Sequence, residues 1–190
     1  SRDASDARLF SKLIRTIWYK DTGPSMMLSR GQQVEHQAFV LLLAERIDVE
    51  VPSLVAVGIV GESESALLVT RPPHGTPLSD LPADALTDDL LDRAWRVVRD
   101  LHGARLSHGR LAATEILVDA DGELALRDAS SMVSSASPER LAQDSVDFLV
   151  TTADLVGVDR AVAAAARSFD HDGLVELIPL DDEVTLVHFG

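Results

Sequence analysis

The stretch that decides the fold reads His108-Gly-Arg-Leu-Ala-Ala-Thr-Glu-Ile-Leu-Val-Asp119, then Ala120-Asp-Gly122, then Glu123-Leu-Ala-Leu-Arg-Asp-Ala-Ser130. Two short apolar runs, residues 116–118 and 124–126, flank Asp-Ala-Asp-Gly, which is a strong turn sequence. The stretch therefore predicts a loop followed by a β-hairpin. Charged side chains stand within the loop at Arg110 and Glu115 and just after the hairpin at Asp128.

The order of these residues resembles the catalytic loop and metal-binding strand of the protein-kinase-like fold, whose motifs are H-R-D-L-x-x-x-N and D-F-G. Arg110 stands at the position of the catalytic Asp, Glu115 at that of the metal-binding Asn, and Asp128 at the Asp of D-F-G. The resemblance is of the aminoglycoside-phosphotransferase and UbiB type and covers about residues 6–170. It implies an α+β fold with a mostly helical C-lobe and a partial N-lobe made of helix C and a β-hairpin.

A narrower resemblance rests on three motifs: Trp18-Tyr-Lys-Asp-x-Gly-Pro24, Val34-Glu-His36, and Leu101-His-x-x-x-Leu-x-His-Gly109. These are similar to kinase-like domains of actinobacterial membrane proteins, where the domain is fused to flippase-like or lysylphosphatidylglycerol-synthase-type transmembrane regions. This resemblance implies a cytoplasmic domain at the inner face of the membrane. Its partner would be another protein or the adjoining transmembrane region.

The substituted loop residues remove the chemistry that the family needs. Phosphoryl transfer uses a carboxylate that accepts the proton of the attacking hydroxyl, and Mg²⁺ ligands that neutralise phosphate charge. Arg110 stays protonated at ordinary pH, so it is no general base. We therefore expect no catalytic residue and no enzyme activity: the domain is a pseudokinase with a regulatory or scaffolding role. In the simplest alternative, Arg110 and Glu115 form a salt bridge and the loop binds no ligand.

The candidate site consists of the residues that would bind Mg²⁺ and ATP if nucleotide binding has been kept. Asp128 and Glu115 are the candidate Mg²⁺ ligands, because hard cations accept carboxylates, and Glu35 and Asp128 are the candidate ATP-binding residues. Glu35, Phe39 and Leu42 reproduce a spacing of helix C, whose Glu pairs with a strand-3 lysine; a solvent-facing carboxylate is the other interpretation. The sequence has no G-x-G-x-x-G. By the resemblance the chain begins just before helix C, so we expect the Gly-rich loop and the strand-3 lysine either upstream in a longer protein or absent from a truncated lobe. We thus expect no cofactor, with residual ATP and Mg²⁺ as the alternative.

Two other functions remain open. The first is an atypical ATP-dependent phosphotransferase acting on a small-molecule or lipid-linked substrate, with His108 in place of the missing base; a packed, structural His108 is the competing interpretation. The second is a nucleotide-independent interaction domain. It would dock through the N-terminal segment or through residues 130–137, whose serine-rich composition predicts a flexible loop that phosphorylation orders or releases.

Composition narrows the classes of function. The chain has 190 residues, 46% of them hydrophobic, which suits one domain or one large fragment. The absence of cysteine excludes disulfides, thiol catalysis and cysteine-based zinc sites. No run approaches the roughly 18 apolar residues of a membrane span. A net charge of −14 argues against nucleic acid as a partner.

The N-terminal segment differs from the rest in charge, with +3 over residues 1–31 against −17 beyond them. Apolar residues recur there at helical spacing, and basic residues share the other face. The apolar set is Leu9, Phe10, Leu13, Ile14, Ile17 and Trp18, and the basic set is Arg8, Lys12 and Arg15. Such a helix either packs on the body of the domain or makes a membrane-surface contact.

The resemblance divides the chain into a partial N-lobe with the basic first helix and helix C (residues 1–71), a hinge (72–79) and a helical C-lobe with the degenerate catalytic loop (80–190). Further helices are expected over residues 32–46, 87–106, 138–156 and 159–169, a hairpin over 54–70, and a strand over 183–189. Two prolines in the hinge remove N–H donors that adenine would need. Asp144 stands where related folds bury an Asp that holds the catalytic loop.

Overall fold

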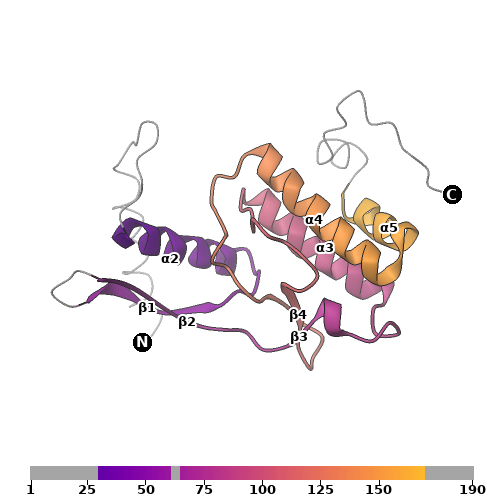
Figure 1. The fold of residues 1–190 in the computed structure, drawn as a ribbon, viewed down its shortest axis with the longest axis horizontal. Helices are drawn as coiled ribbons and strands as arrows, with labels where there is room; N and C mark the ends of the chain where they lie inside the picture. Colours follow the sequence, from indigo (N-terminus) through magenta and orange to yellow (C-terminus); the bar gives the residue numbers. More distant parts are fainter. Residues whose placement is uncertain (1–29, 61–64, 170–190) are drawn as a thin grey trace.

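The computed structural model describes residues 30–60 and 65–169. Helix α2 (Arg30–Arg46) and a two-stranded ribbon lie at one end, three packed helices lie at the other, and a small sheet lies between them (Figure 1). The predicted N-terminal helix and the predicted strand at 183–189 lie outside the described residues.

The ribbon consists of β1 (Ser53–Val60) and β2 (Ser65–Arg71), which pair antiparallel with Val57 opposite Leu68. Helix α2 packs on one face of it. Its buried side chains include Val40, Leu41 and Ala44, which join the main core. The predicted helix and hairpin of this region are both confirmed.

The small sheet has the order β3 (Thr76–Pro77), β4 (Ile116–Val118), β5 (Leu124–Leu126), all antiparallel. The predicted hairpin after the loop is thus confirmed. A short 3₁₀ helix, η1 (Leu78–Asp80), follows β3 and buries Leu78. The amide of Leu126 donates to the carbonyl of Glu50 at 2.8 Å, so the turn after α2 is tied to the strand that leads to Asp128.

The helical end contains α3 (Asp88–Gly103), α4 (Pro138–Val156) and α5 (Val158–Ser168). Trp95 lies at its centre, with the ring of Phe148 edge-on at 4.8 Å and that of Phe169 at 5.8 Å. Such edge contacts add to the apolar burial of the rings. Arg167 of α5 pairs with Asp92 of α3 at 2.7 Å, which fixes these two helices at the surface.

Helix α3 begins as expected but ends earlier than residue 106. The hydroxyl of Thr87 accepts the amide of Leu90 at 3.2 Å, a normal N-cap. The helix stops at Gly103, and Arg105 adopts a left-handed φ of 59°. The amide of Leu106 then donates to the carbonyl of Leu101 at 2.9 Å, which closes the end of the helix, and the side chain of Leu106 is buried.

The expectation of a loose serine-rich loop at residues 130–137 is wrong. Met132 and Ala136 are buried, and Ser107 and Val133 exchange two backbone hydrogen bonds at 3.0 and 2.9 Å. The amide of Ala136 also donates to the carbonyl of Arg105 at 2.9 Å. The serine-rich composition predicted a flexible loop, but burial of the two apolar side chains of Met132 and Ala136 is enough to pack the segment against the rest of the domain.

The structure combines helices with two small antiparallel sheets, which confirms an α+β fold. Among the described helices, none combines the length and the apolar character that a membrane crossing needs.

Candidate functional site

Asp144 of α4 anchors the start of the loop over residues 108–115. Its carboxylate is 1% exposed and accepts the amides of His108 at 2.6 Å and Gly109 at 2.8 Å. The two backbone amides thus donate to a charged acceptor in the protein interior, where an unpaired amide would cost free energy of folding. The expectation that Asp144 is buried and holds the loop backbone is confirmed.

Gly109 is required at its position for two reasons. Its φ is +80°, a conformation that side-chain-bearing residues rarely adopt. A Cβ there would lie 2.8 Å from the carbonyl oxygen of Ser131. The loop therefore passes directly against the segment that follows Asp128.

His108 connects the loop to that same segment. Its ring is buried, and its Nε2 donates to the backbone carbonyl of Asp128 at 2.8 Å, since a carbonyl only accepts. The burial of the ring and this hydrogen bond favour the structural interpretation of His108. The hypothesis that His108 replaces the missing base stays a prediction.

Arg110 is turned toward Asp128. Its Nη2 lies 3.4 Å from Asp128 Oδ2, and its Nε donates to the hydroxyl of Ser131 at 3.1 Å. The predicted salt bridge to Glu115 is wrong, because the hairpin returns a second carboxylate to the loop and Arg110 pairs with that one. The pair is open to solvent, with the side chains 71% and 44% exposed, so its contribution to stability is small.

Asp128 is held as an anion by its own segment. Burial of the carboxyl favours the neutral form, but the hydroxyl and amide of Ser130, the amide of Ala129 and the charge of Arg110 outweigh it and lower the pKa of Asp128. The two Ser130 bonds measure 2.6 and 2.9 Å.

Glu115 is near Asp128 only through the backbone. Its carbonyl accepts the amide of Arg127 at 2.8 Å, while its carboxylate contacts the hydroxyl of Thr114 at 3.4 Å. Within the described ranges, no three His, Cys, Asp or Glu side chains gather in a way that would hold a metal ion. Asp128 is engaged by Arg110 and Ser130, so the roles of Asp128 and Glu115 as Mg²⁺ ligands, and that of Asp128 in ATP binding, stay predictions.

Glu35 lies half-buried on α2, and the described residues include no lysine with which it could pair. Its role in ATP binding remains a prediction. The contact between α2 and the Asp128 segment is made two residues later, where the side-chain amide of Gln37 donates to the carbonyl of Ala129. The sequence did not indicate a role for Gln37, because no sequence motif predicts a hydrogen bond from a helical glutamine to a distant backbone carbonyl.

A second titratable group approaches Asp144 from α3. His102 Nε2 lies 3.9 Å from Asp144 Oδ2, and the imidazole is nearly buried. Burial lowers the pKa of His102, and the negative charge of Asp144 opposes this only in part. His102 is thus neutral near pH 7 and packs beside an ionic anchor.

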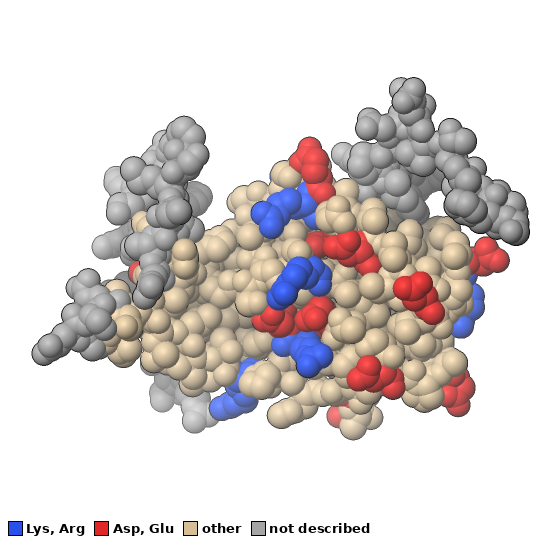
Figure 2. Space-filling model, viewed as in Figure 1, with Lys and Arg blue, Asp and Glu red and all other residues tan. Residues whose placement is uncertain are grey.

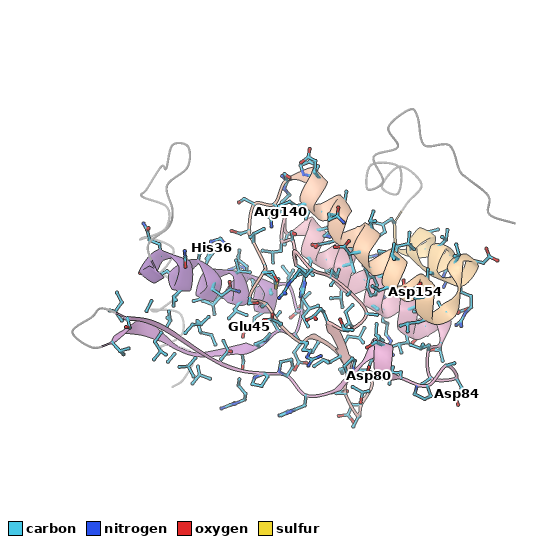
Figure 3. The ribbon with its side chains drawn as sticks, viewed as in Figure 1. His36, Glu45, Asp80, Asp84, Arg140 and Asp154 are labelled. Carbon is cyan, nitrogen blue, oxygen red and sulfur yellow. The ribbon has the colours of Figure 1, made fainter. Side chains whose placement is uncertain are left out.

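An open cleft of about 510 Å³ lies elsewhere, between the end of α2 and residues 71–74. Glu45, Asp48, Glu50 and Asp119 contribute acidic groups to its lining, whereas Arg110, Glu115 and Asp128 do not line it. Burial raises the pKa of Glu45, which Figure 3 shows near the centre of the molecule. The cleft therefore does not belong to the degenerate loop.

The charged side chains on the face seen in Figure 2 are interspersed, with blue and red groups alternating across its middle. Arg140, at the start of α4, is one of the basic groups at the upper edge (Figure 3). This face has no broad surface of one sign that would attract a polyanion.

A scan against models of protein families matched none to this chain, and a search of curated proteins likewise found no match.

Proposed function

We propose that this chain is a pseudokinase domain: a non-catalytic module that keeps a kinase-like loop as a scaffold and regulates or holds a partner. One observation carries the proposal. The guanidinium of Arg110, at the position of the general base in the sequence resemblance, engages Asp128, at the position of the metal ligand. A cation of the protein thus contacts the carboxylate that a metal would need.

The chemistry of the two residues supports this role. Arginine does not accept a proton at ordinary pH, and a carboxylate that is paired with it has less charge to offer a metal. The anchor below the loop is intact, because Asp144 still binds the amides of His108 and Gly109. A loop with a preserved anchor and substituted chemical groups suits a protein-binding role better than phosphoryl transfer.

The narrower sequence resemblance extends the proposal to a setting. By that resemblance the partner is another protein or an adjoining transmembrane region, and the domain works at the inner face of a membrane.

Thermal melting with and without Mg²⁺-ATP tests the proposal, since a ligand that binds only the folded state raises the melting temperature. The chain would be melted alone and with nucleotide at about 100-fold over a micromolar Kd, where the gain is about 2.7 kcal/mol. We expect no shift for the wild-type chain. We also expect no release of phosphate from ATP in a parallel assay.

Three variants make the result specific. Asp128→Ala removes the carboxylate, Arg110→Ala releases it, and Arg140→Ala removes an exposed arginine elsewhere as a matched control. A wild-type shift that Asp128→Ala abolishes and Arg140→Ala keeps would contradict the proposal and favour the phosphotransferase. A shift that appears only in Arg110→Ala would support it, because Arg110 would then be what closes the site.

A further inference from the structure

The outer face of the β1–β2 ribbon is apolar and exposed. Val60, Leu67 and Val69 are 48%, 41% and 37% exposed. Ala56 pairs with Val69 and Gly58 with Leu67, and paired residues of antiparallel strands share a face. The middle of this face therefore presents apolar groups and backbone, without a charged side chain.

Helix α2 packs on the opposite face, where Ile59, which pairs with Ala66 near the end of the ribbon, is still 60% exposed. Ala66, Leu68 and Thr70 alternate with the exposed residues of β2, and all three are half-buried on the side where α2 packs. A two-stranded ribbon with one bare face is marginal in water. A contiguous exposed apolar surface of this kind marks a place where something docks.

We infer that residues 8–19 of this chain cover the outer face of the ribbon. Their sequence has a matching apolar stripe, which runs from Leu9 to Trp18 at helical spacing. Ten helical residues extend about 15 Å. The five residues from Ala56 to Val60 extend about 17 Å as a strand. The stripe and the face thus have the same length as well as the same chemistry.

The connection to α2 permits this placement. Residues 19–29 separate the stripe from Arg30, where α2 begins. Eleven residues span up to about 36 Å when extended. The first turn of α2 lies at the end of the ribbon where β1 passes into β2 (Figure 1). The linker therefore reaches around the ribbon to its other face.

The distribution of charge agrees with apolar docking. Arg8 and Arg15 fall on the side of the segment opposite to the stripe, so they remain in solvent when the stripe is buried. The ribbon face offers them no carboxylate at its central positions. A stripe that is buried on the ribbon is not free to enter a membrane, so this placement excludes the membrane-surface alternative for the same residues.

Limited proteolysis of the whole chain tests the inference. Trypsin cleaves after Lys12 and Arg15, and docking of the segment slows cleavage there because the docked form must open first. The variant Leu67→Thr/Val69→Thr makes the face polar and keeps side chains that suit a strand. We expect cleavage at Lys12 and Arg15 to become at least about tenfold faster in this variant, given the apolar burial that is lost.

The matched control is Val158→Thr/Val162→Thr, which makes the same chemical change at two exposed positions of α5. It should leave the cleavage rate unchanged. Equal rates at Lys12 and Arg15 in the wild type and the ribbon variant would overturn the inference. Circular dichroism of both variants verifies that α2 and the other helices remain folded.

Cross-linking provides a second readout, because the chain has no cysteine of its own. A short bis-maleimide should join Ile17→Cys to Leu67→Cys within one chain, and should join Arg15→Cys to Leu67→Cys far less, since Arg15 lies on the opposite side. Equal yields, or cross-links only between chains, would overturn the inference.

Anionic vesicles of phosphatidylcholine and phosphatidylglycerol separate docking from membrane binding. The wild-type chain should bind them more weakly than the ribbon variant, in which the stripe is released. Equal binding of both would overturn the inference. None of these readouts involves nucleotide, so the inference and the proposed pseudokinase role stand or fall separately.

Discussion

The loop that follows Ser107 has a buried end, at His108 and Gly109, and an exposed end, where Arg110 meets Asp128, and the protein holds the two with different firmness. At one end, the amides of His108 and Gly109 donate to a carboxylate that is 1% exposed. At the other end, Arg110 meets Asp128 in a pair whose side chains are 71% and 44% exposed. The comparison indicates that the contacts of the buried end stabilise the fold. Substitutions at the exposed end alter the chemistry of the loop at little cost in stability.

Removal of the Asp144 carboxylate, which anchors the buried end, should cause the largest loss of stability. Asp144→Ala leaves two buried amides without an acceptor, so we expect a loss of about 3 kcal/mol or more in the free energy of unfolding. Urea denaturation measures it. Asp154→Ala, at an exposed position of the same helix (Figure 3), should stay within about 0.5 kcal/mol. Similar losses in both variants would contradict the anchoring role.

A side chain at Gly109 should have the next largest effect. Gly109→Ala places a Cβ 2.8 Å from the carbonyl of Ser131 at a φ of +80°. Gly122 has a similar φ of +84°, but its nearest neighbour is the far end of Arg93 at 3.9 Å. We expect Gly109→Ala to cost about 2 kcal/mol more than Gly122→Ala, because both share the backbone strain and only the first has the clash. Equal urea midpoints would show that the loop has room to move.

Acidification should weaken the buried end selectively. The pKa of His102 is lowered from 6.5 by burial, so below that pH the unfolded chain binds a proton more readily than the folded one. Stability is then present above about pH 6.5 and falls as the pH drops toward 5, by at most about 1.4 kcal/mol per pH unit. The pKa of His36 is lowered in the same way and adds to the fall.

Urea denaturation of the wild type and of His102→Gln, at about pH 7 and about pH 5.5, measures this dependence. The variant should lose less stability between the two conditions, since the contribution of His102 is then removed. Identical losses would show that His102 is protonated without penalty in the folded chain.

The exposed end should give the smallest effect. A double-mutant cycle with Arg110→Gln and Asp128→Asn should return a coupling below about 1 kcal/mol, because solvent screens the pair. Thermal or urea denaturation of the four chains measures it. A coupling above about 2 kcal/mol would mean that the two ends of the loop are held equally firmly, and would remove the contrast.

Much of the fold was predictable from local sequence. The Asp-Ala-Asp-Gly turn has a local physical cause, and the structure contains the hairpin that it predicts. The helix expected from residue 87 also begins there, behind the cap at Thr87. Burial of Asp144 was also anticipated, through the family resemblance.

The site was less predictable, because its contacts join residues that are distant in sequence. Glu115 and Asp128 carry the same charge, so nothing in the sequence chooses between them as the partner of Arg110. The contact of Gln37 with Ala129 spans 92 positions and involves a backbone acceptor, which has no sequence signal. The end of α3 at Gly103 likewise involves a left-handed conformation at Arg105, and arginine is not a residue that predicts such a conformation.

The sequence by itself determined most of the secondary structure elements, and it placed at residue 110 an arginine, which is no general base, because propensity and side-chain chemistry are local. Only the tertiary structure decided that Arg110 turns to Asp128, that His108 is committed to a backbone carbonyl and that the serine-rich segment is docked. Those outcomes depend on which groups the folded core brings together, and that is a property of the whole chain rather than of any stretch within it.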